Sequence, residues 1–220
     1  MMIKENLQKI KDTIPQNVTL VAVSKTKPIA DIQEAYDAGQ RVFGENKIQE
    51  MVSKYDALPK DIEWHMIGHL QRNKVKYMAH FVSLIHGVDS FKTLKEIDKQ
   101  AKKHNRVINC LLQAKIAKED SKFGLSFSEI ETILASEELK EFKNIAIVGL
   151  MGMATFTHDK DQLTEEFSSL NDFQKKIQEK YPKLTTLSMG MSGDYPLAIS
   201  LGSNMVRIGS SIFGVRNYIA

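Results

Sequence analysis

Short apolar runs rich in β-branched residues recur along the whole chain and alternate with segments of helical spacing. Such runs predict buried strands. The eight runs are VTLVAVS (18–24), RVFG (41–44), IEWHMIG (62–68), FVSLIHGV (81–88), VINCLLQAKI (107–116), IAIVGLM (145–151), TTLSMG (185–190) and MVRIG (205–209). Alternating strands and helices predict a parallel α/β sheet, and eight units close naturally into a single (β/α)8 barrel of the TIM type. The alternation also permits an open doubly wound sheet, but the count of eight favours the barrel.

Helix signals fall between these runs. Segments 90–103 and 161–180 carry apolar residues at helical spacing. A further helix near 3–13 precedes the first strand, and we expect the segment 1–17 to be an accessory that covers the floor or flank of the barrel. We find no linker or internal repeat, so we predict one domain over residues 1–220. The candidate boundary residues are Pro28 and Gly39 around a helix over 29–38, with Asp89 and Ser90, and Ser126 to Ser128, as N-cap candidates.

Composition excludes several classes of protein. With 42% hydrophobic and 26% charged residues among 220, and a net charge of +3, the chain is neither disordered nor basic enough to suggest nucleic acid binding. Its single cysteine, Cys110, cannot form an internal disulfide. The amino terminus lacks the apolar run of a signal peptide, and the run 145–156 is too short to span a bilayer. We expect a cytoplasmic monomer without a membrane partner.

Polar residues gather where the predicted strands end. In a barrel these carboxyl ends form one rim, which carries the functional site. Lys25 follows the first run, and there partial desolvation and nearby cations lower the pKa of an amine and make it a Schiff-base nucleophile. The alternative is a solvated lysine at a strand end, the interpretation we give Lys27.

Two loops rich in glycine and serine follow the seventh and eighth runs. Phosphate sites of this fold commonly form there, and we name Ser192, Gly209 and Ser210 as the donors. The alternative is that small residues only allow tight turns. Arg207 lies inside an apolar run, so its guanidinium needs a partner: a ligand heteroatom, or a carboxylate such as Glu45 or Asp194.

Three more residues complete the predicted site. Asn46 follows the second run, and His65 lies near the end of the third, where it acts as an acid or base or only bonds a neighbouring loop. Met189 fills the core or forms an apolar wall of the pocket. Gly68 interrupts any helix between His65 and His69, so we assign no metal.

Seven blocks of sequence, in order, resemble the pyridoxal phosphate homeostasis protein family, whose members are single-domain proteins similar to the barrel domain of alanine racemase. The resemblance covers essentially the whole chain and is therefore more specific than any one motif. The blocks are AVSKTKP (22–28), AGQRVFGENKIQE (38–50), WHMIGHLQRNK (64–74), SKFGL (121–125), GLMGM (149–153), LSMGMSGDYPLAI (187–199) and VRIGSSIFG (206–214).

The resemblance implies a barrel that carries pyridoxal 5′-phosphate (PLP) as a Schiff base on Lys25. It also implies that the phosphate lies against the SMGMS and RIGSS segments, with Arg207 at the pyridine nitrogen. One departure is Gln113-Ala114-Lys115, where many relatives have an asparagine. Lys115 is therefore a candidate second lysine facing the site.

The resemblance also bears on catalysis. PLP works best as an electron sink when a carboxylate keeps its ring nitrogen protonated, and an arginine does the opposite. Racemases of this type take a second base from an additional domain, whereas this chain ends at Ala220. We therefore expect a PLP carrier in vitamin B6 and amino-acid homeostasis, without catalytic residues and with apo PLP-dependent enzymes as candidate recipients. The alternatives are a one-domain racemase or Schiff-base aldolase using Lys25, and a phosphosugar-binding barrel.

Overall fold

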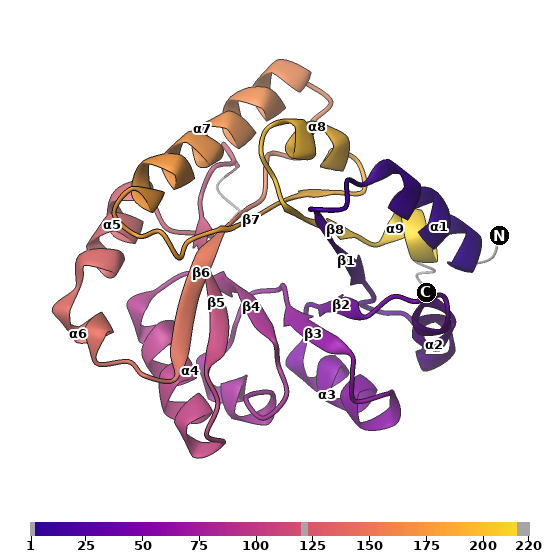
Figure 1. Ribbon diagram of the computed structural model, residues 1–220, viewed down its shortest axis with the longest axis horizontal. Coiled ribbons are helices and arrows are strands. Elements are labelled where there is room, and N and C mark those ends of the chain that lie inside the picture. The colour runs from indigo at the N-terminus through magenta and orange to yellow at the C-terminus, as the bar shows by residue number, and fades with distance from the viewer. Residues whose placement is uncertain (1–2, 120–122, 215–220) are drawn as a thin grey trace.

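The strands form a closed parallel barrel in the order β1-β2-β3-β4-β5-β6-β7-β8 (Figure 1). The computed structural model describes residues 3–119 and 123–214, so residues 121–122 of the SKFGL block lie outside the described residues. The predicted (β/α)8 barrel is confirmed. The strands are β1 (Thr19–Val23), β2 (Val42–Glu45), β3 (Glu63–Met66), β4 (Leu84–Val88), β5 (Ile108–Ala114), β6 (Ile145–Gly152), β7 (Thr186–Met191) and β8 (Met205–Ile208).

Helices surround the barrel (Figure 1). They are α1 (Ile3–Thr13), α2 (Ile29–Asp37), α3 (Ile48–Ala57), α4 (Phe91–Lys103), α5 (Phe127–Ala135), α6 (Glu137–Lys140), α7 (Lys160–Gln178), α8 (Tyr195–Ser200) and α9 (Ser210–Phe213). The β3–β4 connection departs from the alternation because it contains a 3-10 helix, η1 (Arg72–Tyr77). Its sequence RNKVKY buries only Val75 and lacks the apolar stripe that would hold an α-helix against the barrel. No helix in the two described ranges is long and apolar enough to cross a membrane.

The predicted helix boundaries have physical causes in the structure. The Ser90 hydroxyl accepts a hydrogen bond from the Thr93 amide at the start of α4. Ser126 forms a reciprocal capping box with Glu129 at the start of α5. Gly39, just after α2, has a φ of +87°, a conformation that side chains with a Cβ rarely adopt.

The accessory helix α1 covers the flank of the barrel. It packs beside α9 and α2, next to the seam where β1 pairs with β8 (Figure 1). The Asn6 side-chain amide donates to the Ile212 carbonyl (3.1 Å), and the Lys4 amide donates to Glu34 (3.2 Å). The first bond ties α1 to α9, and the second ties α1 to α2.

The buried apolar residues form two separate groups. The larger lies between the barrel and its helices and includes Trp64, Phe43 and Phe167, each fully buried. Because side chains alternate along a strand, the other face of each strand points into the barrel. That inner face carries the second group, which we call the interior plug: Val21, Leu84, Leu111, Met151 and Met205.

Candidate functional site

A cavity of about 480 Å³ opens at the carboxyl ends of the strands. This volume lies within the range of about 300–1,000 Å³ that ligand pockets commonly have. Its lining includes six of the residues predicted from sequence: Lys25, Asn46, Ser192, Arg207, Gly209 and Ser210. Residues from four different strand ends therefore meet at one site.

The structure places Met189 away from this cavity. Its side chain is fully buried in the core between barrel and helices, while Met191 lines the cavity instead. The register of β7 on β8 shifts between Ser188 and Met191, and Gly190 in between has a φ of +95°. This extra residue breaks the alternation of β7, so Ser188 and Met191 both face inward.

Lys115 also lies outside the cavity. Its side chain is exposed, and its backbone amide donates to the Leu125 carbonyl at 2.9 Å. The two lysines of the first block, Lys25 and Lys27, both line the cavity, and Lys27 is half-buried rather than the solvated lysine expected from sequence. The Lys27 ammonium donates to the Phe213 carbonyl (2.8 Å), which ties the β1 end to α9.

Arg207 is a cation held by neutral groups at the cavity floor. Its guanidinium donates to the Ser188 hydroxyl (2.6 Å) and the Gly152 carbonyl (3.0 Å). Burial lowers the pKa of Arg207 to about 10, and the Asp194 charge raises it. Arg207 thus stays charged at neutral pH. Glu45, one of its candidate carboxylate partners from sequence, pairs with Lys54 instead, because the Glu45 side chain faces α3 rather than the barrel interior.

Below Arg207 a line of hydrogen bonds crosses the barrel interior. Ser188 lies 3.1 Å from His86 Nδ1, and His86 Nε2 lies 3.1 Å from His65 Nδ1. Since the Ser188 oxygen accepts from Arg207, its hydrogen is left to donate to His86. His86 then donates through Nε2 to His65. We call Arg207, Ser188, His86 and His65 the polar relay.

The polar relay keeps both histidines neutral. Burial lowers the pKa of His65 to about 3. Burial lowers the pKa of His86 well below its usual value, with further lowering from His65 and Arg207. His65 is thus part of the support of Arg207 and is not among the residues that line the cavity.

Small residues form the side of the cavity between β7 and β8. The Gly209 amide donates to the Ser192 hydroxyl at 3.2 Å. A Cβ on Gly209 would lie 3.0 Å from the Val23 carbonyl oxygen, a tight contact, so glycine suits the close approach of the β8 end to the β1 end. Hydroxyls and amides at this corner suit an anionic oxygen ligand.

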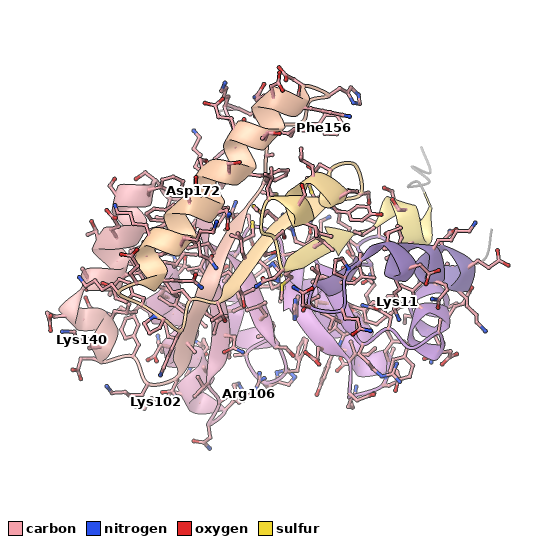
Figure 2. All side chains as sticks on the ribbon, turned by 45° about the horizontal axis from the view of Figure 1, so that its top comes forward. Lys11, Lys102, Arg106, Lys140, Phe156 and Asp172 are labelled. Carbon is pink, nitrogen blue, oxygen red and sulfur yellow. The ribbon has the colours of Figure 1, made fainter. Side chains whose placement is uncertain are left out.

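The outer wall is the loop that follows β6, residues 153–158. Thr155 donates to Glu166 on α7 through its amide and its hydroxyl, both at 2.7 Å. Phe156 lies next to it, 89% exposed, beyond the start of α7 (Figure 2). Figure 2 places Lys102 and Arg106 at the opposite end of the molecule, on the side of the barrel floor.

Several residues of the site were not predicted from sequence. His86 and Ser188 are polar residues within apolar runs, and this contrast indicates buried side chains that need hydrogen-bond partners. Lys54 gave none, because it lies in the polar stretch SKYDALPK (53–60) and resembles a surface lysine.

Comparisons with known proteins agree with this architecture. A family model described as alanine racemase, N-terminal domain, matches residues 2–217. A protein of Synechocystis sp. named pyridoxal phosphate homeostasis protein is 41% identical over 207 residues, covering 93% of this chain and 94% of the relative. PipY of Synechococcus elongatus PCC7942, solved without PLP, has a TM-score of 0.91 at 36% identity, covering 96% of this chain and 100% of PipY. PipY with PLP bound has a TM-score of 0.87 at 35% identity, with the same coverage.

A more distant likeness concerns the fold alone. Alanine racemase of Clostridium difficile 630 has a TM-score of 0.80 at 15% identity. The match covers 99% of this chain and 57% of the racemase. The shared part is the barrel.

Proposed function

This chain belongs to the pyridoxal phosphate homeostasis protein family, within the alanine racemase N-terminal domain family, and from that premise we propose that it binds PLP at Lys25 and serves PLP homeostasis. The observation that carries the proposal is the meeting of Lys25, Arg207 and the Ser192, Gly209 and Ser210 corner in one cavity. The relative PipY has been solved with PLP bound.

The residues of the cavity fit this cofactor. PLP supplies an aldehyde that condenses with primary amines, a pyridine ring that withdraws electrons, and a phosphate. Lys25 offers the amine, Ser192 and Ser210 offer hydroxyl donors for the phosphate, and the Gly209 amide holds the Ser192 hydroxyl at this corner. Val23, Ile67 and Met191 offer apolar walls for the ring, and ligand pockets commonly combine such apolar walls with a few polar groups.

Arg207 is suited to face an acceptor such as an unprotonated ring nitrogen. A guanidinium carries five N–H donors, and Ser188 and Gly152 take one each from the side of the barrel interior. A fixed cation disfavours protonation of an acceptor that faces it. Because a protonated ring is the better electron sink, this arrangement favours holding the cofactor over turnover.

The titration of the nearby histidines supports the same conclusion. A general acid or base works best when its pKa lies near the working pH. The pKa of His65 is lowered to about 3, and that of His86 is also well below its usual value. We therefore infer a carrier without robust catalysis that releases PLP to apo enzymes in the cytoplasm.

Chemical trapping tests this proposal. Incubation with PLP, reduction with borohydride and peptide mapping should place the pyridoxyl group on Lys25. Lys25→Ala should abolish the label, whereas Lys115→Ala, at an exposed lysine outside the cavity, should retain it. A label on Lys115 in the wild-type protein would overturn the assignment. Turnover of D- or L-amino acids at ordinary enzymatic rates, about 1–10³ per second, would replace the carrier with a one-domain enzyme.

A further inference from the structure

The backbone on both sides of Lys25 is held from behind by one helix. The Lys54 ammonium on α3 donates to the Ser24 carbonyl at 2.7 Å. The Thr26 amide donates to Glu50 Oε1, also on α3, at 2.5 Å. The residue that faces the cavity thus lies between two backbone groups, each bonded to a charged side chain.

These charged side chains form a single buried network. Lys54 donates to Glu45 Oε1 and to Glu50 Oε1, both at 2.7 Å. The Ser24 hydroxyl donates to the same Glu45 oxygen at 2.6 Å. The side chains of Lys54 and Glu45 are 5% and 0% exposed. Buried ion pairs are often no more stabilising than apolar residues of the same volume, so stability alone does not account for this one.

The network lies on the outer face of the barrel wall. Gly44 faces the interior, where a Cβ would lie 2.9 Å from Val21 Cγ1. Since side chains alternate along β2, Glu45 points outward, to α3. The network therefore supports Lys25 from the face opposite the cavity and does not occupy ligand space.

Thr26 shows that the local backbone needs this support. Its φ is +63°, in the left-handed region that β-branched residues rarely adopt. Such conformations persist where surrounding contacts hold them, and they cluster at functional sites. The bond from the Thr26 amide to Glu50 is a contact of this kind.

The network also carries an excess of negative charge. Glu45 and Glu50 share one ammonium, and Glu45 Oε2 is buried without a hydrogen bond to any described residue. The pKa of Glu45 is raised, because burial raises it by more than Lys54 and Ser24 lower it. On the cavity side, the charged or titratable residues that line the wall with Lys25 are Lys27, His158, Asp194 and Arg207.

We propose that Lys54, Glu45 and Glu50 form a positioning clamp that orients the Lys25 side chain and sets the balance between its charged and neutral amine. The clamp acts through the peptide groups on either side of Lys25, so its members are positioning residues. The proposal deepens the function above and rests on attachment of PLP at Lys25. The competing explanation is that the network only docks α3 on the barrel.

The rate of PLP capture provides the first test. PLP is added to the apo protein, samples are quenched with borohydride over time, and the label on the Lys25 peptide is quantified. Lys54→Met should slow capture by about tenfold or more, because displacement of a reacting group by about 1 Å can cost about a hundredfold. Lys95→Met is the matched control, since Lys95 forms an exposed ion pair with Glu138 at the same distance, 2.7 Å.

A second pair of variants guards against misfolding. Lys54→Met leaves the Glu45 carboxylate buried without its cation, which can unfold the protein. Lys54→Met/Glu45→Gln removes both charges and should fold, yet still capture PLP slowly because the Ser24 carbonyl loses its donor. Glu50→Gln keeps an acceptor for the Thr26 amide, so it should capture PLP within about threefold of the wild-type rate, well short of the loss expected from displacement.

The protonation of Lys25 provides the second test, and it needs no PLP. Apo protein is labelled with acetic anhydride at a series of pH values, and acetylation of Lys25 is followed by peptide mapping. Lys54→Met removes a cation near Lys25 and should raise the labelling midpoint of Lys25 by roughly one pH unit. Glu50→Gln removes an anion and should lower this midpoint. If the network only docked α3 on the barrel, the two substitutions would not shift the labelling midpoint of Lys25 in opposite directions.

The outcomes separate the two proposals. A wild-type capture rate in folded Lys54→Met/Glu45→Gln, together with a wild-type acetylation midpoint in Glu50→Gln, would overturn the clamp. Failure of the wild-type protein to take up PLP at Lys25 would overturn the proposed function, while the acetylation midpoints would still decide whether the network controls Lys25.

Discussion

The interior of the barrel has two layers of opposite character. Toward the floor lies the interior plug of Val21, Leu84, Leu111, Met151 and Met205, which is apolar and tightly packed. Toward the mouth lies the polar relay from His65 to Arg207, which is equally buried but made of hydrogen-bonding groups. Strands β4 and β8 carry members of both layers: Leu84 and His86 are two residues apart on β4, as are Met205 and Arg207 on β8.

This difference separates stability from function between the two layers of the barrel interior. Burial of apolar side chains drives folding, so the plug supplies free energy that the relay does not. The relay holds a cation and two neutral histidines out of water, and each needs its partner to offset desolvation. Changes in the plug should therefore alter unfolding and leave binding intact, while changes in the relay should alter both.

A cavity in the plug should give the largest change in stability. Leu111 is fully buried in the plug, and Leu111→Ala should lower the free energy of unfolding by about 2–5 kcal/mol. Urea unfolding measures this loss, and the amount of PLP trapped on Lys25 at low temperature should stay unchanged. Loss of PLP from a folded Leu111→Ala protein would mean that the two layers are coupled.

Removal of one relay hydroxyl should act on both stability and binding. Ser188→Ala deprives Arg207 of an acceptor and His86 of a donor, so the free energy of unfolding should fall by about 1–3 kcal/mol. PLP should also bind more weakly, because Arg207 is no longer held in place. Titration calorimetry and urea unfolding check both effects.

The control is Ser53→Ala, at an exposed serine that bonds the Gln49 carbonyl within α3. It should change neither quantity. A Ser188→Ala protein that loses stability but binds PLP as tightly as the control would limit the relay to a structural role.

The fold was predictable from sequence because it depends on patterns that repeat. Strand and helix alternation needs no single residue to be interpreted correctly, and the rim position of Lys25 and Arg207 follows from where their strands end. Details that break a pattern were not predictable. The bulge at Gly190 turns Met191 into the cavity, whereas strict alternation from Ser188 would point Met191 outward, and a sequence pattern does not reveal one inserted residue. The role of Lys54 depends on a contact across 30 positions of sequence.

Acid should weaken the relay in a defined direction. The pKa of His65 falls from 6.5 to about 3 on folding. Between these two values His65 is protonated in the unfolded chain but neutral in the folded protein. Stability from this group is complete above pH 6.5 and declines as the pH falls toward 3, by roughly 1.4 kcal/mol per pH unit. His86 shifts in the same direction.

Urea unfolding at about pH 7 and about pH 5 measures this decline, with His86→Gln as the comparison. The variant lacks one titrating group, so its stability should fall less between the two conditions. An equal fall in both proteins would show that His86 titrates normally in the folded state.

The smallest expected effect lies at the solvent-exposed mouth of the cavity. The Ser210 hydroxyl is exposed at the start of α9, so Ser210→Ala should leave the free energy of unfolding unchanged. One exposed hydrogen bond contributes about 0.5–1.5 kcal/mol, so PLP should bind about twofold to tenfold more weakly. Pyridoxal, which has no phosphate, should bind equally to wild type and variant, because Ser210 then has no partner to lose. Equal weakening for both ligands would place Ser210 against another part of the cofactor and would move the phosphate away from this corner.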